Sequence, residues 1–445
     1  MARKVFISVL GTSFYKPCIY GDTGIKTRFI QEATLLSIGT KEWGRDDTGI
    51  VLLTDFARKT NWEVADNQRL DKTIGTVEDY CGLRQRIDAL QLPFAVRDIP
   101  IPDGKNEDEM WTIFTTLFNE LQEGDELYID LTHAFRYLPM LVLVLTNYAK
   151  FLKGVTVKSI TYGNWEARDG DRAPIVDLLP IAALQDWTHA AASFIQDGDA
   201  AKLAQMTLSE LKPILRDRTR DDLKSAQMLR VLVDNLEKVT SEMLTCRGLS
   251  IENSETIKAL KKYLNQLEEV IIKPIKPIID KVKDEFTDFN EEPDVKNGFH
   301  AAKWCIQHGL YQQATTILQE SVVSFFCRRY EGIVTCDQLE DSRNIISTAF
   351  NILAEGIAEE NWRLRKQEYL PRLKKVLNAF EDDYDAFVVQ TQGDQKEHIS
   401  ATYRALSDLR NDINHNGMRN NPLKPLAIKR KTEEFYNRIY SCLFE

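Results

Sequence analysis

The apolar residues of the first 185 positions follow two alternating patterns. Short, almost continuous apolar runs predict buried strands at 5–10, 49–54, 93–102, 125–131 and 155–162. Between these runs, Met110, Phe114, Leu117 and Leu121 recur at helical spacing, and Tyr137–Leu152 forms another helical segment. Strands separated by helices favour parallel pairing with right-handed crossovers. The pattern therefore predicts an α/β, Rossmann-like N-terminal domain with a parallel sheet.

After Pro180 the strand pattern largely stops, and the rest of the chain predicts an all-α region. Lys273–Pro277 contains two prolines and predicts a kink or a helix boundary. The polar segment Asp288–Lys296 contains a further proline and is typical of a domain junction. We expect an N-terminal domain at 1–185, a helical connecting domain at 186–292 and a C-terminal helical domain at 293–445.

Composition narrows the possible functions. The chain has 445 residues, of which 43% are hydrophobic and 28% charged, as in a folded protein of two or three domains. Its net charge of −10 argues against a protein that coats nucleic acid, so any contact with nucleic acid must be local. The seven cysteines form no C-x-x-C pair, which indicates free thiols and no zinc site. We expect no metal and no cofactor.

Neither end of the chain nor its apolar runs predict a membrane protein. The first ten residues lead directly into a strand pattern without a small-residue cleavage site, so no signal peptide is expected. The most apolar segment, Tyr137–Leu152, contains Asn147 and Lys150 and is shorter than the roughly 20 residues that a bilayer requires. The expected location is the cytoplasm.

A first group of candidate residues follows the predicted strands. Asp130–Arg136 joins a buried strand to a helix, with Pro139 near the first helical turn. Such a loop lies at the carboxyl edge of the sheet, where helix N-termini favour anions and doubly wound sheets bind ligands. Two other strand ends can converge there. The predicted ligand-binding residues are Gly11, Thr12, Ser13, Thr132, His133, Ala134, Phe135, Arg136, Gly163, Asn164 and Trp165.

Two simpler interpretations apply to this region. In the first, the Thr132-His133 pair has no ligand role and simply forms a turn that caps the next helix. Gly21–Thr27 superficially resembles a phosphate loop, but it lacks the G-x-x-x-x-G-K-[ST] spacing and receives no nucleotide triphosphate role.

A second group lies near the C-terminus. Apolar residues from Ile399 to Ile413 predict one buried helix face, and the same helix carries Arg410 and His415 at R-x4-H spacing. Asn416-Gly417 then suits a left-handed C-cap. The segment from 402 to 431 contains seven Lys or Arg and two Asp, which gives it a net charge of +5. Arginine can stabilise phosphorane charge and histidine can move a proton, so such a pair can cleave RNA through its 2′-hydroxyl without metal.

The bare R-x4-H spacing also arises by chance, and a helix-terminal histidine is commonly only a cap. The helix places Arg410 and His415 about 140° apart, so two copies across a two-fold axis are needed to bring both types of side chain together. His398 lies close enough to the motif to remain a further candidate, and Glu381–Asp385 is interpreted as an acidic loop.

The N-terminal segment resembles a family of CRISPR-associated proteins. Asp130-Leu-Thr-His-Ala resembles the D-x-T-H-G motif that names the family, with Ala134 in place of its glycine. Lys26–Ala33 and Leu10-Gly-Thr-Ser are similar to further stretches of the same family. The resemblance covers about 185 residues and implies a CRISPR-associated Rossmann fold (CARF) domain, which binds cyclic oligoadenylate in the family.

The C-terminal helix resembles the R-x4-6-H motif of HEPN ribonucleases, which follow CARF domains in this family. The resemblance implies that Arg410, Asn411 and His415 are catalytic. The expected protein is a cyclic oligoadenylate-activated, metal-independent endoribonuclease of single-stranded RNA in type III CRISPR antiviral defence. It is expected to form a homodimer or a higher multiple of dimers, and to have a functional link to a type III CRISPR effector without stable binding. A cyclic oligoadenylate of even size can lie on a two-fold axis, and of these rings cyclic tetra-adenylate is the expected activator. The alternatives are a non-catalytic sensing regulator and a sensor that also degrades its ligand.

Overall fold

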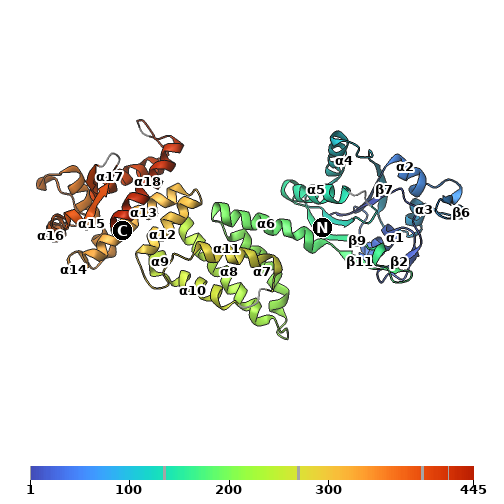
Figure 1. Ribbon diagram of the computed structural model, residues 1–445, viewed down its shortest axis with the longest axis horizontal. Coiled ribbons are helices and arrows are strands. Elements are labelled where there is room, and N and C mark those ends of the chain that lie inside the picture. Colours follow the sequence, from blue (N-terminus) through green and yellow to red (C-terminus); the bar gives the residue numbers. More distant parts are fainter. Residues whose placement is uncertain (1, 134–136, 268–270, 392–394, 419) are drawn as a thin grey trace. The chain divides into compact units, whose positions relative to one another are not determined.

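The computed structural model describes residues 2–133, 137–267, 271–391, 395–418 and 420–445. The chain divides into two compact units, Met1–Asp186 and Trp187–Glu445 (Figure 1). The first is an α/β unit and the second is almost entirely helical. The expected fold class is therefore confirmed.

The first unit is built on a six-stranded sheet in the order β11-β9-β8-β1-β4-β7. Its strands are β1 (Lys4–Leu10), β4 (Thr48–Leu53), β7 (Ala95–Pro100), β8 (Glu126–Asp130), β9 (Thr156–Gly163) and β11 (Ile175–Asp177). All neighbouring pairs are parallel except the edge strand β11, which pairs antiparallel with β9. After β1 the chain adds β4 and β7 on one side, and then β8 and β9 on the other. The strand order therefore reverses between β1 and β8, where open α/β sheets bind ligands.

Helices cover both faces of this sheet because successive residues of a strand point to opposite sides. Val5, Ile7 and Val9 of β1 pack in one apolar cluster with residues of α4 and α5. Phe6 and Leu10 belong to a separate cluster that includes residues of α1 and α3. The helices of this unit are α1 (Ile30–Ser37), α2 (Asp55–Ala57), α3 (Leu83–Ala89), α4 (Glu107–Glu120), α5 (Leu138–Lys153) and the first part of α6 (Leu179–Asp197).

Several small elements were absent from the prediction. They are β2 (Cys18–Tyr20), β3 (Lys26–Thr27) and β10 (Arg172–Ala173), which form one sheet, and the hairpin of β5 (Gln68–Asp71) and β6 (Thr76–Asp79). The side chains of the β5–β6 hairpin are mostly exposed, so this hairpin lacks the apolar alternation that marks a half-buried strand. The antiparallel edge strand β11 has only three residues, which is too short for such a pattern to be read.

The second unit has one apolar cluster that extends from Trp187 to Ile439. Its helices are α7 (Ala201–Arg216), α8 (Leu223–Leu244), α9 (Gly248–Asn253), α10 (Glu255–Gln266), α11 (Lys276–Glu285), α12 (Lys296–Gln307), α13 (Tyr311–Arg329), α14 (Glu331–Val334), α15 (Leu339–Glu355), α16 (Leu370–Asp382), α17 (Ile399–Asn414) and α18 (Pro425–Phe444). Both regions predicted at 186–292 and 293–445 contribute to this cluster, and the functional division between them stays a prediction.

The helical prediction needs one correction at the C-terminal end. A short antiparallel hairpin of β12 (Val388–Gln390) and β13 (Lys396–His398) precedes α17. Each strand has only three residues, which is too short for a period-two pattern to be read in the sequence. The predicted helix boundary at Lys273–Pro277 is confirmed, because α11 begins at Lys276 after a single 3-10 turn.

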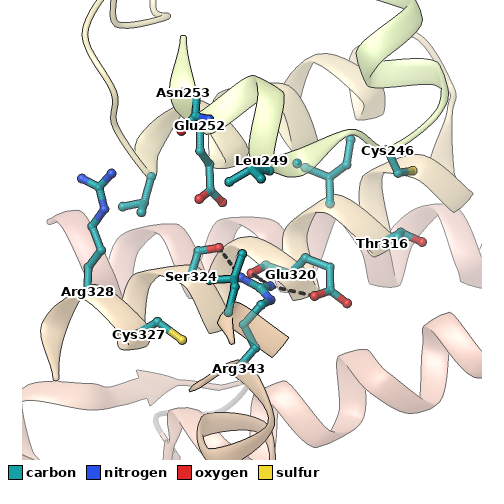
Figure 2. A pocket seen from close by; sticks show the side chains of 14 residues that line it. Cys246, Leu249, Glu252, Asn253, Thr316, Glu320, Ser324, Cys327, Arg328 and Arg343 are labelled. Atoms are coloured by element: carbon teal, nitrogen blue, oxygen red, sulfur yellow. Dashed lines mark hydrogen bonds and ion pairs between the residues drawn. The ribbon is translucent and has the colours of Figure 1, made fainter. Parts of the chain in front are cut away.

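A pocket of about 400 Å3 opens among α9, α13 and α15 of the second unit (Figure 2). Within the described residues, no helix has the length and apolar character that crossing a bilayer requires.

Candidate functional site

The predicted ligand loops meet at the carboxyl edge of the sheet, on both sides of the point where the strand order reverses. Gly11 follows β1, and a Cβ atom there would lie 2.8 Å from the backbone oxygen of His133 and 2.7 Å from the Tyr15 hydroxyl. Only glycine allows the two loops to approach this closely. The Thr132 hydroxyl accepts a hydrogen bond from the Gly163 N–H at 2.7 Å, which joins the third loop to the second.

A buried carboxylate holds these strand ends together. Asp130 accepts hydrogen bonds from the Ser8 hydroxyl at 2.7 Å and from the Thr132 hydroxyl at 2.6 Å. It also accepts one from the Thr132 N–H at 3.2 Å. Burial raises the pKa of the Asp130 carboxyl, and the hydrogen bonds from Thr132 and Ser8 oppose that rise. The Thr132 side chain thus positions three strands, because its hydroxyl donates to Asp130 and accepts from Gly163.

His133 lies flat against an aromatic ring. Its imidazole stacks on Tyr15 with ring centroids 3.7 Å apart and planes 11° from parallel. Its Nδ1 atom is buried and has no hydrogen-bond partner within the described part of the chain. Burial lowers the pKa of His133 from 6.5 to about 3. The imidazole is therefore neutral near pH 7 and can exchange hydrogen bonds, but it cannot supply a positive charge there.

Two side chains that the sequence analysis missed hold the first loop in place. Asn61 donates to the Gly11 oxygen at 2.7 Å and to the Ser13 oxygen at 3.0 Å. Arg69 donates to the Thr12 oxygen at 2.8 Å and to the Ser13 oxygen at 3.0 Å. The guanidinium group of Arg69 and the amide of Asn61 thus occupy the negative ends of these peptide dipoles. That arrangement makes the loop more favourable to an anionic ligand.

Arg28 supports the same loop from another element. It donates to the Tyr15 oxygen at 2.8 Å, and its guanidinium carbon lies 4.9 Å from the Tyr80 ring centroid. Arg28 belongs to the Lys26–Ala33 stretch, which was noticed only through its family resemblance. Asn61 and Arg69 come from a π-helical turn and from the polar hairpin, and neither segment shows a pattern that marks it.

The remaining predicted ligand residues are only partly placed. The Asn164 side chain accepts a hydrogen bond from the Ala167 N–H at 3.2 Å and caps a 3-10 turn, and Trp165 packs beside Cys18 and Tyr20. Ala134, Phe135 and Arg136 lie outside the described residues.

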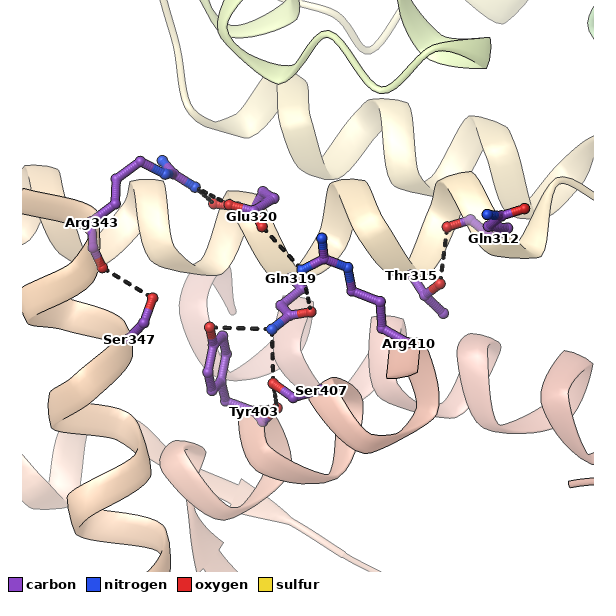
Figure 3. A network of polar contacts seen from close by, with 9 residues as sticks. All are labelled: Gln312, Thr315, Gln319, Glu320, Arg343, Ser347, Tyr403, Ser407 and Arg410. Carbon is purple, nitrogen blue, oxygen red and sulfur yellow. Dashed lines mark hydrogen bonds and ion pairs between the residues drawn. The ribbon is translucent and has the colours of Figure 1, made fainter. Parts of the chain in front are cut away.

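The second predicted site lies on α17, where Arg410 is anchored to α13 (Figure 3). One guanidinium nitrogen of Arg410 donates to Gln319 at 3.1 Å and to Glu320 at 3.2 Å. Its Nε atom is buried and has no partner among the described residues. Glu320 also pairs with Arg343 at 2.7 Å, so one carboxylate is shared by two guanidinium groups. Arg410 therefore retains donor capacity for an anion.

Asn411 and His415 are both exposed. His415 ends α17, and Asn416 and Gly417 follow with φ of 54° and 65°, as the predicted left-handed C-cap requires. Within the described residues no hydrogen bond joins His415 to Arg410.

The positive charge counted around this helix is partly neutralised by carboxylates from outside the counted window. Arg404 pairs with Glu355 at 2.9 Å, Arg410 with Glu320 at 3.2 Å, and Arg430 with Glu434 at 3.5 Å. The net of +5 therefore overstates the local charge, because a count along the sequence omits partners brought by folding.

The other candidate residues have structural partners. His398 is buried, stacks on Tyr384, and caps α17 by accepting a hydrogen bond from the Ser400 N–H at 3.3 Å. Glu381–Asp385, predicted as an acidic loop, is instead the end of α16 followed by a 3-10 turn, and Asp383 there pairs with Arg329 at 3.1 Å. Across the described residues, no group of three His, Cys, Asp or Glu is arranged to hold a metal ion. All seven cysteines are free.

Comparison with known proteins places the first unit in a family context. Residues 6–165 match the CARF domain of the CRISPR system endoribonuclease Csx1. The CRISPR-associated protein MJ1674 of Methanocaldococcus jannaschii is 28% identical over 232 residues, which are 51% of this chain and 33% of that protein. The chain thus spans about a third of the length of this curated relative. These similarities support a CRISPR-associated CARF protein, while the HEPN and D-x-T-H-G resemblances stay predictions.

Thr132→Val tests the hydrogen bonds that join the strand ends. The change leaves the buried Asp130 carboxylate and the Gly163 N–H each without one partner, so we expect the free energy of unfolding to fall by about 1–3 kcal/mol. Urea denaturation measures this loss. Thr132→Ser keeps the hydroxyl and should retain most of the stability, whereas equal losses in both variants would show that the hydroxyl is unimportant.

The buried imidazole predicts a pH dependence of stability. His133 of the unfolded chain takes up a proton below about pH 6.5, whereas His133 of the folded protein stays neutral down to about pH 3. The free energy of unfolding therefore falls as the pH decreases from about 6.5 towards about 3. His133→Phe removes this titration and keeps an aromatic ring against Tyr15. Between pH 7 and pH 5 the parent should lose on the order of 1–2 kcal/mol more than the variant in urea denaturation. Parallel pH profiles would contradict a depressed pKa.

Proposed function

We propose that this chain senses cyclic oligoadenylate in its first unit and cleaves single-stranded RNA in its second, as part of type III CRISPR antiviral defence. The observation that carries the sensing half is the junction of Gly11, Thr132 and Gly163 at the reversal of strand order, within the segment that matches a CARF domain. Such an edge suits an anionic, nucleotide-like ligand. Cyclic tetra-adenylate is the activator that we favour.

The loops whose positions are fixed by the hydrogen bonds of Asp130 and Thr132 would contact the ligand. The backbone at Gly11–Ser13 and the neutral imidazole of His133 would face the ligand, with Gly163–Trp165 at its side. Because the pKa of His133 is lowered to about 3, this residue is a poor proton donor near pH 7. That property favours binding over degradation of the ligand by the same domain.

The nuclease half of the proposal rests on α17. Arg410, whose side chain is 29% exposed, would hold the scissile phosphate with the guanidinium N–H groups that Glu320 and Gln319 leave unused. The exposed His415 would move a proton to or from the reacting oxygens. The RNA 2′-hydroxyl would attack the adjacent phosphate and expel the 5′-oxygen, leaving a 2′,3′-cyclic phosphate. This route requires neither a metal nor a cofactor.

A homodimer would supply the second copy of α17. An exposed apolar stripe on α5 supports it, because Met140, Val144 and Tyr148 follow one another at four-residue spacing and are 71%, 57% and 49% exposed. Helix α5 starts after the ligand loop, so pairing through it would place two loops near one axis. An even cyclic ligand could then occupy that axis.

The catalytic assignment is tested by RNA cleavage with saturating cyclic tetra-adenylate. His415→Ala and Arg410→Ala should each lower the activated rate by about 100-fold or more, since each removes a proton-transfer or charge-stabilising group. Arg430→Ala, in the same basic segment, should cleave like the parent, and EDTA should not inhibit. If His415→Ala cleaved RNA at the parental rate, the catalytic assignment would be wrong. The chain would then be better described as a sensing regulator without catalysis.

The dimer is tested by placing a charge in the α5 stripe. Val144→Glu should convert the dimer to a monomer in light scattering at micromolar concentration, because two like charges would be buried near the axis. It should also abolish ligand-activated cleavage. Val77→Glu adds the same charge at a 62% exposed position of β6 and serves as the control. A Val144→Glu protein that remains dimeric would place the interface elsewhere.

A further inference from the structure

The pocket among α9, α13 and α15 combines an apolar rim with polar groups that converge inside (Figure 2). Its volume of about 400 Å3 lies within the range of small-molecule sites. Leu249 and Leu339 line it and are 61% and 55% exposed, so apolar side chains stand where the pocket meets solvent. The rim therefore offers flat apolar contact to a planar ligand.

One carboxyl group points into this pocket from α9. Glu252 reaches towards Ser324 of α13, and both Arg328 and Arg343 lie close enough to influence it electrostatically. Burial raises the pKa of Glu252, while Ser324 and the two arginines oppose that rise. Among the described residues, Arg343 pairs with Glu320, and no ion pair joins Glu252 to either arginine. Arg343 already donates to the Ser324 hydroxyl and to Glu320, each at 2.7 Å, so its charge lies beside the Glu252 carboxyl group without pairing with it.

The pocket is connected to the proposed catalytic arginine through Glu320. One oxygen of Glu320 accepts from Arg343, which lines the pocket, and the other accepts from Arg410. Cys246, another lining residue, lies within electrostatic range of Arg410. Burial raises the pKa of its thiol, and the charge of Arg410 opposes that rise. Glu320 alone would therefore connect Arg343, at the wall of the pocket, to Arg410.

We propose that this pocket binds the guanine base of the RNA nucleotide next to the scissile phosphate. The inference rests on the proposed nuclease function and adds its base preference. Guanine presents two adjacent N–H donors, which the Glu252 carboxylate can accept together, and an O6 acceptor that suits a guanidinium group. Adenine and cytosine place a ring acceptor where guanine has N1–H, and that acceptor would face the carboxylate. Leu249 and Leu339 would cover the base.

Arg328 would play a different part from Glu252. Its side chain is exposed at the edge of the pocket, where it can reach a phosphate of the bound strand. Phosphate contacts fix the position of a nucleic acid, whereas contacts to base edges specify its sequence. The two residues therefore predict two distinct phenotypes.

The test is cleavage of a randomised single-stranded RNA pool by the intact, ligand-activated chain, with sequencing of the new ends. The parent should favour guanine beside the cut, and Glu252→Gln should reduce that preference by about 5- to 150-fold, the usual range for one bidentate base contact. Arg328→Gln should slow cleavage of all sequences without changing the preference. Glu237→Gln, an exposed carboxylate of α8 outside the pocket, is the matched control.

A binding measurement separates failure of this inference from failure of the nuclease proposal. Calorimetry with guanosine monophosphate should detect binding to the parent that weakens in Glu252→Gln, with weaker binding of the adenosine, cytidine and uridine monophosphates. Active protein whose base preference is unchanged in Glu252→Gln would overturn the pocket assignment and leave the nuclease intact. Inactive protein that still binds guanosine monophosphate through Glu252 would overturn the nuclease and retain the pocket as a guanine site. Thermal melting confirms that each variant is folded.

Discussion

The buried carboxylate of Asp130 is the constraint on which the ligand side of this protein depends. A carboxyl group removed from water is costly unless its oxygens are satisfied, and here Ser8 of β1 and Thr132 after β8 satisfy them. Thr132 in turn holds the Gly163 N–H of β9. One polar group in the sheet thus fixes three adjacent strand ends. The loops that follow them can then be short, close together and arranged in advance for a ligand.

A shared carboxylate plays a comparable part in the helical unit. Glu320 lies between Arg343 and Arg410, so a change in the position of one arginine affects the other. In this arrangement the proposed catalytic group, the proposed guanine pocket and the core of the helical unit meet on α13. Activation then requires a ligand that favours the arrangement in which Arg410 faces RNA, since tight binding alone shifts no equilibrium.

Much of the first unit could be predicted because its central strands are continuous apolar runs and its helices have a clear period. The convergence of Gly11, Thr132 and Gly163 could be predicted because parallel strands end at one edge. Asn61 and Arg69 could not be predicted, because they reach the loop by tertiary contacts from a π-helical turn and a polar hairpin. Similarly, the helix of Arg410 was predicted, but its partner Glu320, 90 residues away, could not be inferred from spacing. The overestimate of local positive charge has the same origin.

The central claim is that one ligand at the strand ends changes the helical unit. Hydrogen–deuterium exchange of the intact chain, with and without cyclic tetra-adenylate, tests it most directly. The account predicts slower exchange in peptides containing Gly11–Ser13, Thr132–His133 and Gly163–Trp165, together with altered exchange in α17. Protection confined to other segments, or strand-end protection with no change in α17, would contradict it.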